Sequence, residues 1–257
     1  MSVKLTFLGT GTSQGVPVIA CDCEVCVSGD IKDDRLRSSV LFQTEGKTLL
    51  IDTGPDFRQQ MLRANVQSLD GVLYTHEHKD HTAGMDDVRA FNFKHKKAME
   101  LYVDERVNKT LRREYQYVFS GSNYPGIPQV NLNLIDKHAE KITVAGVEVV
   151  LIKLMHYKLP IYGFRVGNIA YCTDTNYIAP EEMKKLKGLD VLVITALRKE
   201  KHISHFSLSE SLGVIAELKP KQAYLTHISH LLGKHADVSL ELPSNVQIAW
   251  DGLEVES

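Results

Sequence analysis

The chain repeatedly alternates between short apolar runs rich in β-branched residues and longer segments in which apolar and polar positions are mixed. Short apolar runs of this composition favour β-strands. They predict strands at residues 3–8, 38–43, 47–52, 71–75, 142–154, 161–166, 169–173, 191–195, 222–226 and 246–250. The first of these strands begins almost at the N-terminus, and the last lies close to the C-terminus.

Helical patterns fill several of the intervals between these runs, at residues 55–66, 84–93, 104–118, 180–186 and 207–218. Pro55 suits the first turn of a helix. Ser207 followed by Glu210 matches a capping box. Because both halves of the chain combine strands with helices, we expect two sheets packed together with helices outside. Periodicity alone does not fix the order of these layers.

Composition adds limits to this picture. The 257 residues are 43% hydrophobic and 24% charged, which is typical of a globular protein with a substantial core. The net charge of −2 gives no general footprint for nucleic acid, although a local basic patch would be compatible with it. No apolar run is long enough to predict a membrane span. The N-terminus lacks a secretory pattern, so we expect a cytoplasmic protein.

The strongest chemical signal is the sequence HEHKDH at residues 76–81, directly after the apolar run 71–75. It places three imidazoles and two carboxylates within six residues. These groups are ligands that zinc and similar divalent metals prefer. A loop beyond a strand end can bring several such side chains to one point, so we expect a metal site here.

A second cluster consists of Cys21, Cys23 and Cys26, three of the four cysteines in the chain. A disulfide framework would be unusual in a protein without a secretory leader. The spacing C-x-C-x-x-C supplies three thiolates, one ligand short of a closed tetrahedral zinc site. His230 is the candidate for the fourth ligand. Cys172 is a weaker candidate, and its strand-like surroundings favour a small core residue.

Two further segments invite a functional interpretation. Residues 9–15, with the sequence GTGTSQG, look like a phosphate-binding loop but lack the Gly-Lys-Ser/Thr ending and the G-x-G-x-x-G spacing. We interpret them as the turn that leaves the first strand. Residues 119–130 are rich in glycine and proline, and they suit a mobile lid and a simple connector equally well.

The pattern H-x-H-x-D-H after a strand resembles the signature of the metallo-β-lactamase superfamily. The later motif positions of that superfamily follow in order: LIDTG at residues 50–54, His156 after a strand, YCTDT at residues 171–175 and LTH at residues 225–227. The resemblance implies an α/β fold of the αββα sandwich type, with two mixed β-sheets flanked by helices. It implies a single domain over residues 1–257, with the metals at one edge of the sandwich.

The same resemblance implies a dinuclear site. One metal would be held by His76, His78 and His156, the second by Asp80, His81 and His227, and Asp174 would bridge the two. Imidazole and carboxylate accept zinc and manganese alike, so both stay open. Two such ions could share a hydroxide that attacks phosphorus. Asp52 suits a simple turn, but we expect it to orient a ligand imidazole or a loop amide.

A narrower resemblance comes from GVPV at residues 15–18, the cysteine cluster, and THISH at residues 226–230. Together they look like the phosphodiesterase family of the bacterial carbon–phosphorus lyase pathway. This implies a structural zinc on Cys21, Cys23, Cys26 and His230, and it implies a homodimer. His205 matches a histidine of those relatives that protonates the leaving oxygen or steadies the phosphate, with His202 as its rival.

These observations predict a dinuclear metal-dependent phosphodiesterase that cleaves a small, including cyclic, phosphodiester. In the superfamily that the motif resembles, lactamases often lack a ligand at the position of Asp80, so the resemblance implies phosphate or thioester hydrolysis over lactam hydrolysis. We expect Asp80 and His205 to be the catalytic residues. The alternatives are a ribonuclease of the tRNA 3′-processing type, a thioester hydrolase, and a non-catalytic accessory protein on the same fold. Because all seven ligand positions are occupied, we favour an enzyme with a small-molecule substrate.

Overall fold

The computed structural model describes residues 2–121 and 124–257. Within these residues, one sheet has seven strands in the order β15-β1-β2-β3-β4-β5-β6. The strands are β1 (Lys4–Gly9), β2 (Ser39–Thr44), β3 (Lys47–Ile51), β4 (Gly71–Leu73), β5 (Met99–Val103), β6 (Val130–Leu134) and β15 (Glu254–Glu256). Pairing is antiparallel from β15 to β3 and parallel from β3 to β6, so this sheet is mixed.

The second sheet has eight strands in the described residues, in the order β11-β8-β9-β10-β12-β13-β14, with β7 paired to β8. The strands are β7 (Lys141–Val144), β8 (Val147–His156), β9 (Leu159–Val166), β10 (Ile169–Cys172), β11 (Tyr177–Ile178), β12 (Val191–Thr195), β13 (Gln222–Thr226) and β14 (Val246–Ile248). Its strands β10, β12, β13 and β14 run parallel, while β7, β8, β9 and β11 pair antiparallel.

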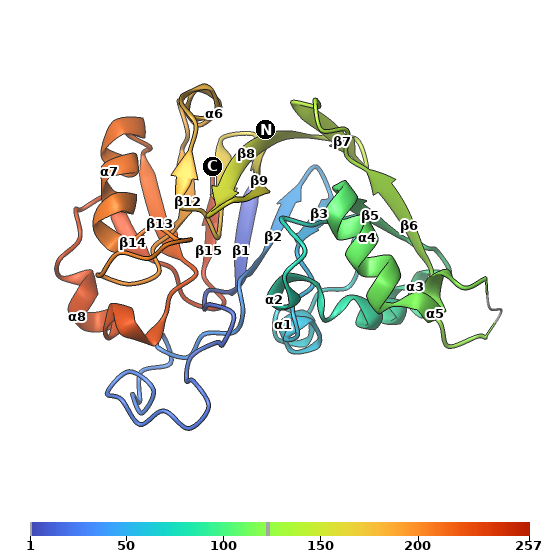
Figure 1. The fold of residues 1–257 in the computed structure, drawn as a ribbon, viewed down its shortest axis with the longest axis horizontal. Helices are drawn as coiled ribbons and strands as arrows, with labels where there is room; N and C mark the ends of the chain where they lie inside the picture. Colours follow the sequence, from blue (N-terminus) through green and yellow to red (C-terminus); the bar gives the residue numbers. More distant parts are fainter. Residues whose placement is uncertain (1, 122–123) are drawn as a thin grey trace.

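Helices lie on the outer side of each sheet (Figure 1). Beside the first sheet are α1 (Phe57–Arg63), α2 (Lys79–Thr82), the 3₁₀ turn η1 (Met85–Val88), α3 (Arg89–His95), α4 (Glu105–Glu114) and α5 (Gln116–Phe119). Beside the second are α6 (Pro180–Lys185), α7 (Leu208–Leu218), the 3₁₀ turn η2 (His230–Leu232) and α8 (His235–Ser239). None of the helices formed by the described residues is long and apolar enough to cross a membrane.

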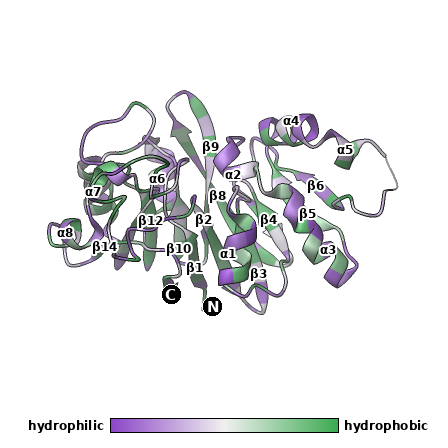
Figure 2. Cartoon of the chain, turned by 90° about the horizontal axis from the view of Figure 1, so that it is seen from below, coloured by the Kyte–Doolittle hydropathy of each residue, from purple (hydrophilic) through white to green (hydrophobic). Residues whose placement is uncertain are grey.

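Three apolar cores hold these layers together. The central core joins the inner faces of the two sheets, through residues such as Phe42 of β2 and Phe164 of β9. A second core packs α1, α3 and α4 on the first sheet, and a third packs α6, α7 and α8 on the second. In Figure 2 the strands at the centre of the molecule are coloured largely as hydrophobic. The layer order is therefore helix, sheet, sheet, helix, and the predicted αββα sandwich is confirmed.

The predicted elements need several corrections. The run 142–154 is a hairpin, because Ala145 and Gly146 both have positive φ, 51° and 94°, as in a two-residue type I′ turn. The helix predicted at 104–118 is broken at Tyr115, where φ is −112°. Pro55 lies outside α1, whose N-cap is Asp56. Strands β5, β6, β11 and β15 were not predicted.

Both ambiguous loops can be placed. The segment after β1 is a turn, as predicted, and Gly11 forms isolated bridges with Arg37 and Ile228 that tie the two halves of the chain together. The described part of residues 119–130 connects α5 to β6. Residues 122 and 123 of this predicted lid or connector lie outside the described residues.

Candidate metal centres

The seven predicted ligands of the dinuclear site all follow the carboxyl ends of strands. His76 and His78 come after β4, with Asp80 and His81 in the short helix α2 just beyond. His156 ends β8, and Asp174 and His227 follow β10 and β13. Since the carboxyl ends of parallel strands meet at one edge of a sheet, this topology gathers the side chains there.

The loop after β3 holds α2 in place. The amide of Thr53 donates to the carbonyl of His81 over 2.8 Å, and the amide of Gly84 donates to the carbonyl of Thr53 over 2.8 Å. A Cβ at Gly54 would lie 2.3 Å from the carbonyl oxygen of Asp80, so only glycine allows this close approach. The backbone of α2 is therefore fixed before any metal binds.

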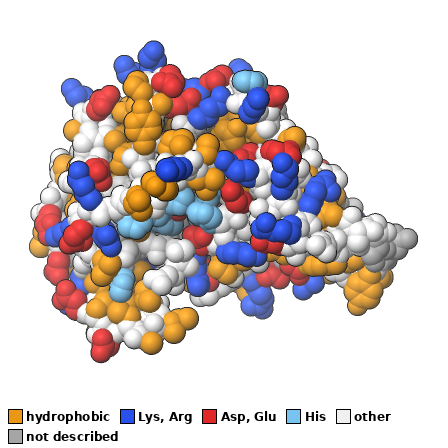
Figure 3. Space-filling view, viewed as in Figure 1, with side chains coloured by type: hydrophobic (Ala, Val, Ile, Leu, Met, Phe, Trp, Pro, Cys, Tyr) orange, Lys and Arg blue, Asp and Glu red, His pale blue; other side chains and the backbone are white. Residues whose placement is uncertain are grey.

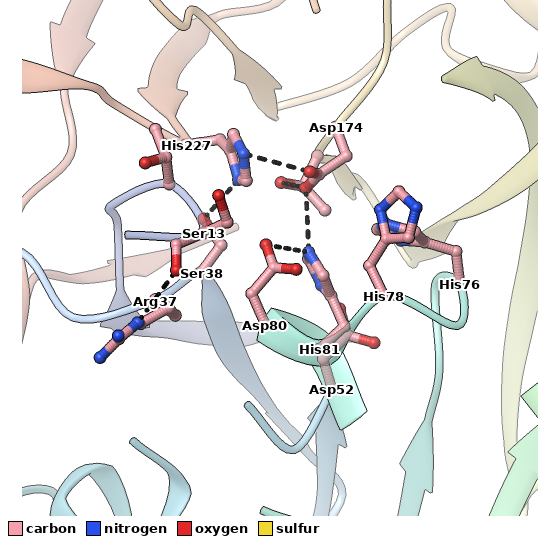
Figure 4. Close-up of polar contacts among 12 residues, drawn as sticks. Ser13, Arg37, Ser38, Asp52, His76, His78, Asp80, His81, Asp174 and His227 are labelled. Carbon is pink, nitrogen blue, oxygen red and sulfur yellow. Dashed lines mark hydrogen bonds and ion pairs between the residues drawn. The ribbon is translucent and has the colours of Figure 1, made fainter. Parts of the chain in front are cut away.

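The seven side chains converge in overlapping groups whose possible ligand atoms lie within 4.8 Å of one another. The groups are His76 with His78 and His156; Asp80 with Asp174 and His227; and His76 with His81 and Asp174. Asp174 lies between His227 and His81 in Figure 4, with His76 and His78 to one side. The arrangement places one carboxylate between two sets of imidazoles, as a bridging ligand requires.

Hydrogen bonds select the ring nitrogen that each histidine turns inward. The hydroxyl of Ser38 donates to the carbonyl of Gly11 over 2.8 Å, so it accepts from Nδ1 of His227 at 3.2 Å. Nδ1 of His156 donates to the carbonyl of Ser204 over 2.9 Å. Each bond occupies Nδ1 and leaves Nε2 with a free lone pair, which is what a metal needs.

Asp52 organises two of the remaining histidines. Its carboxylate accepts from Nδ1 of His81 at 2.7 Å and from the amide and hydroxyl of Thr75, each at 2.8 Å. Because the hydroxyl of Thr75 is used in this way, it accepts from Nδ1 of His76 at 2.9 Å. Asp52 thus orients the imidazole of the candidate ligand His81 and also binds a loop amide, that of Thr75.

The charges of the cluster suit a cation. Burial opposes a charged His81, but Asp80 and Asp174 raise its pKa well above the ordinary value. Burial also works against the charged form of Asp174, yet His227 and His81 hold the pKa of that carboxyl well below the ordinary range. Nε2 of His81 is buried and faces Oδ2 of Asp80 at 3.2 Å and Oδ2 of Asp174 at 3.5 Å. A divalent ion would satisfy both this nitrogen and the carboxylates, so the residues fit the metals that the family pattern implies.

His205 lies over this cluster, on the loop between β12 and α7. Its ring centroid is 4.6 Å from that of His156 and 4.8 Å from that of His227. Nδ1 is buried without a hydrogen-bond partner in the described residues and lies 4.0 Å from Asp174 Oδ1. Burial, followed by the charge of His227, lowers the pKa of His205 to about 2, so the free imidazole is neutral. His202 lies farther out, 5.2 Å from the His205 ring.

The cysteine cluster forms a separate site on the connection between β1 and β2. The Sγ atoms of Cys21, Cys23 and Cys26 lie 3.3, 3.4 and 3.5 Å from Nδ1 of His230. Tetrahedral zinc with ordinary bond lengths would separate sulfur and nitrogen ligands by about 3.5 Å. The amide of Cys26 is the main cause that lowers the pKa of Cys23, to about 6. All four cysteines are free thiols, and Cys172 is a buried core residue as predicted.

Three residues that support the site were missed in the sequence. Ser38 and Ser204 hold imidazoles of residues far away in the chain, so no local motif could indicate them. Thr75 directly precedes His76, and its position beside the motif was the available signal. Lys79, by contrast, is exposed and pairs with Glu114.

An αββα sandwich with imidazoles and carboxylates gathered at one edge defines a metallo-β-lactamase-type hydrolase. Residues 47–228 match the family model described as the beta-lactamase superfamily domain. A crystal structure described as a new diphosphatase from the PhnP family is 40% identical, with a TM-score of 0.92 over 100% of this chain and 98% of that one. The chain therefore belongs to the metallo-β-lactamase superfamily and, within it, to the PhnP family.

Two other relatives limit what can be transferred. An octanoyltransferase of Porphyromonas gingivalis is 39% identical over 98% of this chain but only 51% of its own length. The chain thus spans about half of that curated relative. The short form of human tRNase Z has a TM-score of 0.71 at 18% identity, covering 98% of each chain, which is a likeness of fold alone.

Proposed function

We propose that this protein is a dinuclear metal-dependent phosphodiesterase. The observation that supports this most directly is the position of Asp174 between two sets of imidazoles at the edge of the sandwich. His78 is exposed whereas His76 is buried, so the cluster is open on one side to a substrate. Zinc or manganese in these positions would acidify a shared water and neutralise charge on a phosphoryl oxygen.

The residues of this chain have distinct tasks in the proposal. Asp80 and Asp174 supply negative charge that holds the cations, with Asp174 shared between them. Asp52, Ser38 and the carbonyl of Ser204 keep the imidazoles in one tautomer and one orientation. Such preorganisation removes the cost of moving dipoles and ligands during the reaction.

His205 is proposed to contact the substrate. It lies beside His156 and His227 and has an unpartnered buried nitrogen. A neutral imidazole donates a hydrogen bond through its N–H group. A bound phosphate dianion or monoanion nearby would raise the pKa of His205 and let it transfer a proton to the leaving oxygen.

We also propose a structural zinc on Cys21, Cys23, Cys26 and His230. The separations between sulfur and nitrogen fit a closed tetrahedral shell, which leaves no position for a substrate. Residues 10–38 contain no strand or helix, so a metal there would supply order that the backbone does not.

The similarity to a PhnP-family diphosphatase supports the proposal that the substrate is cleaved at a phosphorus–oxygen bond. The test is a screen of the metal-loaded protein on bis(p-nitrophenyl) phosphate, cyclic nucleotides, a thioester and a pre-tRNA, with Asp80→Ala as the background control. We expect hydrolysis of the small phosphodiesters, bis(p-nitrophenyl) phosphate or a cyclic nucleotide, that the control lacks. Hydrolysis of the thioester alone, cleavage of pre-tRNA alone, or equal rates in Asp80→Ala would refute the proposal.

A further inference from the structure

The hairpin that carries His156 has an unusual turn. Strands β8 and β9 are joined by Tyr157 and Lys158, since His156 pairs with Leu159. Tyr157 has a φ of 56°, in the left-handed region that favours glycine. The cost of that backbone conformation for a bulky residue is of the order of 1 kcal/mol or more.

Other two-residue hairpins of the molecule use glycine where the turn needs it. Gly46 and Gly146 occupy the second central position of the turns after β2 and β7, each with positive φ. Gly167 occupies the first central position of the turn after β9, with a φ of 55° that matches Tyr157. The first central positions of the turns after β2 and β7 hold Glu45 and Ala145, each with a φ of 51°, so this position is not restricted to glycine. Tyr157 differs from these residues in carrying an exposed aromatic ring.

Positive φ at residues other than glycine also marks the candidate metal site. Asp52, Asp174 and His227 have φ values of 65°, 59° and 57°. Tyr157 shares this feature and directly follows the candidate ligand His156. Six other described residues, in turns and after helices away from this cluster, have the same backbone conformation, so what sets Tyr157 apart is its place beside His156.

The side chain of Tyr157 is available to a ligand. It is 48% exposed, although the preceding His156 is buried. Ile203, 64% exposed, lies on the loop that leads to His205. Asn176 links the two residues, because its Oδ1 accepts from the amide of Tyr157 at 2.7 Å and its Nδ2 donates to the carbonyl of Ile203 at 3.0 Å.

Two loops that carry exposed apolar residues, the rim of the cluster, are thus joined through their backbones by Asn176. The carbonyl of Ser204, next to Ile203, holds His156, so the rim and the candidate ligands share one hydrogen-bond network. Figure 3 shows hydrophobic side chains bordering the histidines of the central hollow. A flat ring beside a phosphate-binding centre is suited to stack on another ring, and each such contact is worth about 1–3 kcal/mol with a nucleobase.

We propose that Tyr157 and Ile203 form a subsite for an aromatic ring carried by the phosphate ester, a nucleobase in the first instance. This inference rests on the proposed phosphodiesterase function and names the class of substrate for it. Tyr157 would supply the stacking face, and Ile203 would cover the edge of the ring. The phosphate would then lie beside His156 and His205.

The test compares phosphate monoesters with and without an aromatic ring. Binding of adenosine 5′-monophosphate, phenyl phosphate and ribose 5-phosphate to the metal-loaded protein is measured by calorimetry. We expect adenosine 5′-monophosphate to bind more tightly than ribose 5-phosphate in the wild type. Tyr157→Gly should weaken the nucleotide by about 5- to 150-fold and leave ribose 5-phosphate unchanged, while Tyr157→Phe keeps the preference.

Stability separates this role from a structural one. Tyr157→Gly should melt at the same temperature as the wild type or higher, because glycine relieves the turn. Glu45→Gly, at a φ of 51° in the turn between β2 and β3, is the matched control and should change no binding constant. Tight binding of phenyl phosphate as well would show that any aromatic ring suffices, and tight binding of the nucleotide alone would select the nucleobase.

Two negative outcomes are distinguishable. If the wild type hydrolyses bis(p-nitrophenyl) phosphate but binds the nucleotide and ribose 5-phosphate equally, the subsite is refuted and the proposed function stands. The subsite is also refuted if Tyr157→Gly keeps the full preference for the ring. A wild type that hydrolyses no phosphodiester refutes the proposed function and the subsite together.

Discussion

His227 and His230 are three residues apart, yet they belong to two clusters that differ in nearly every physical respect. His227 is buried at the end of β13 among imidazoles and carboxylates, in a cluster that is open on one side. His230 is half-buried and faces three cysteines, which with it make a closed set of four candidate ligands. One loop thus contributes to a site suited to exchange ligands and to a site suited to hold its metal permanently.

The surrounding structure differs as well. Around His227, strands and hydrogen bonds fix each side chain, as the bond from Ser38 shows. Around His230, the three cysteines lie on a connection without regular structure. We infer that the fold positions the side chains of the first site before metal binds. At the second site, metal binding would order the chain. Substitutions in the cluster around His227 should therefore lower turnover, whereas substitutions in the cysteine cluster should lower stability.

The largest expected effect is on turnover. Asp80→Ala and His81→Ala should each lower kcat by more than about 100-fold. Removing a residue that only hydrogen-bonds to a metal ligand typically costs about 10- to 100-fold in metal affinity or activity, and losing the ligand itself should cost more. The melting temperature and the zinc held by the cysteines should stay close to those of the wild type. A phosphodiesterase rate near normal in Asp80→Ala would contradict the assignment.

Asp52→Asn probes the support of the ligands. The amide keeps the shape of the side chain but loses the charge that faces Nδ1 of His81 at 2.7 Å. We expect a loss of about 10- to 100-fold in metal affinity or activity. Titration with metal at fixed substrate separates the two, and unchanged affinity together with unchanged activity would remove Asp52 from the account.

His205→Ala should lower kcat by about tenfold or more without a change in metal content. The loss should shrink for esters with good leaving groups such as p-nitrophenolate, since these need little protonation. Equal losses on good and poor leaving groups would make His205 a phosphate-positioning residue instead. With no loss at all, the role passes to His202, which is tested in the same way.

Cys23→Ser should have the smallest effect on turnover and a clear effect on stability. Losing one of four zinc ligands removes folding energy that the metal supplies, so the melting temperature should fall while kcat per folded molecule stays the same. Cys172→Ser is the matched control, because this buried thiol lies outside both clusters and its replacement should not alter zinc content. A Cys23→Ser variant that melts like the wild type would count against a structural zinc.

The sequence predicted those parts of the fold and site that depend on local pattern. Strands β12 and β13 follow their apolar runs residue for residue, and the H-x-H-x-D-H motif lies where β4 ends. Strand β6, with asparagines alternating with apolar residues, was missed because it is half-buried at best and lacks a continuous apolar run. The short helix α2 was missed because it is four residues long and is held by tertiary contacts, among them those with the loop after β3.

Long-range geometry could not be read from the sequence. Nothing in the chain near Ser38 indicates that it orients His227, 189 residues away. The burial that makes His205 neutral depends on how the loop after β12 packs against β8 and β13. The exposed ring of Tyr157 became informative only when its backbone conformation was known.

The central claim is that one open and one closed metal site share this chain. The most direct test measures metal content per chain before and after mild chelation, together with activity. We expect about three metal ions at the start, loss of two of them together with all activity on chelation, and one zinc that stays with the folded protein. Protein from zinc-replete medium that contains no zinc resistant to chelation, or that keeps its activity when the exchangeable metals are gone, would contradict the account.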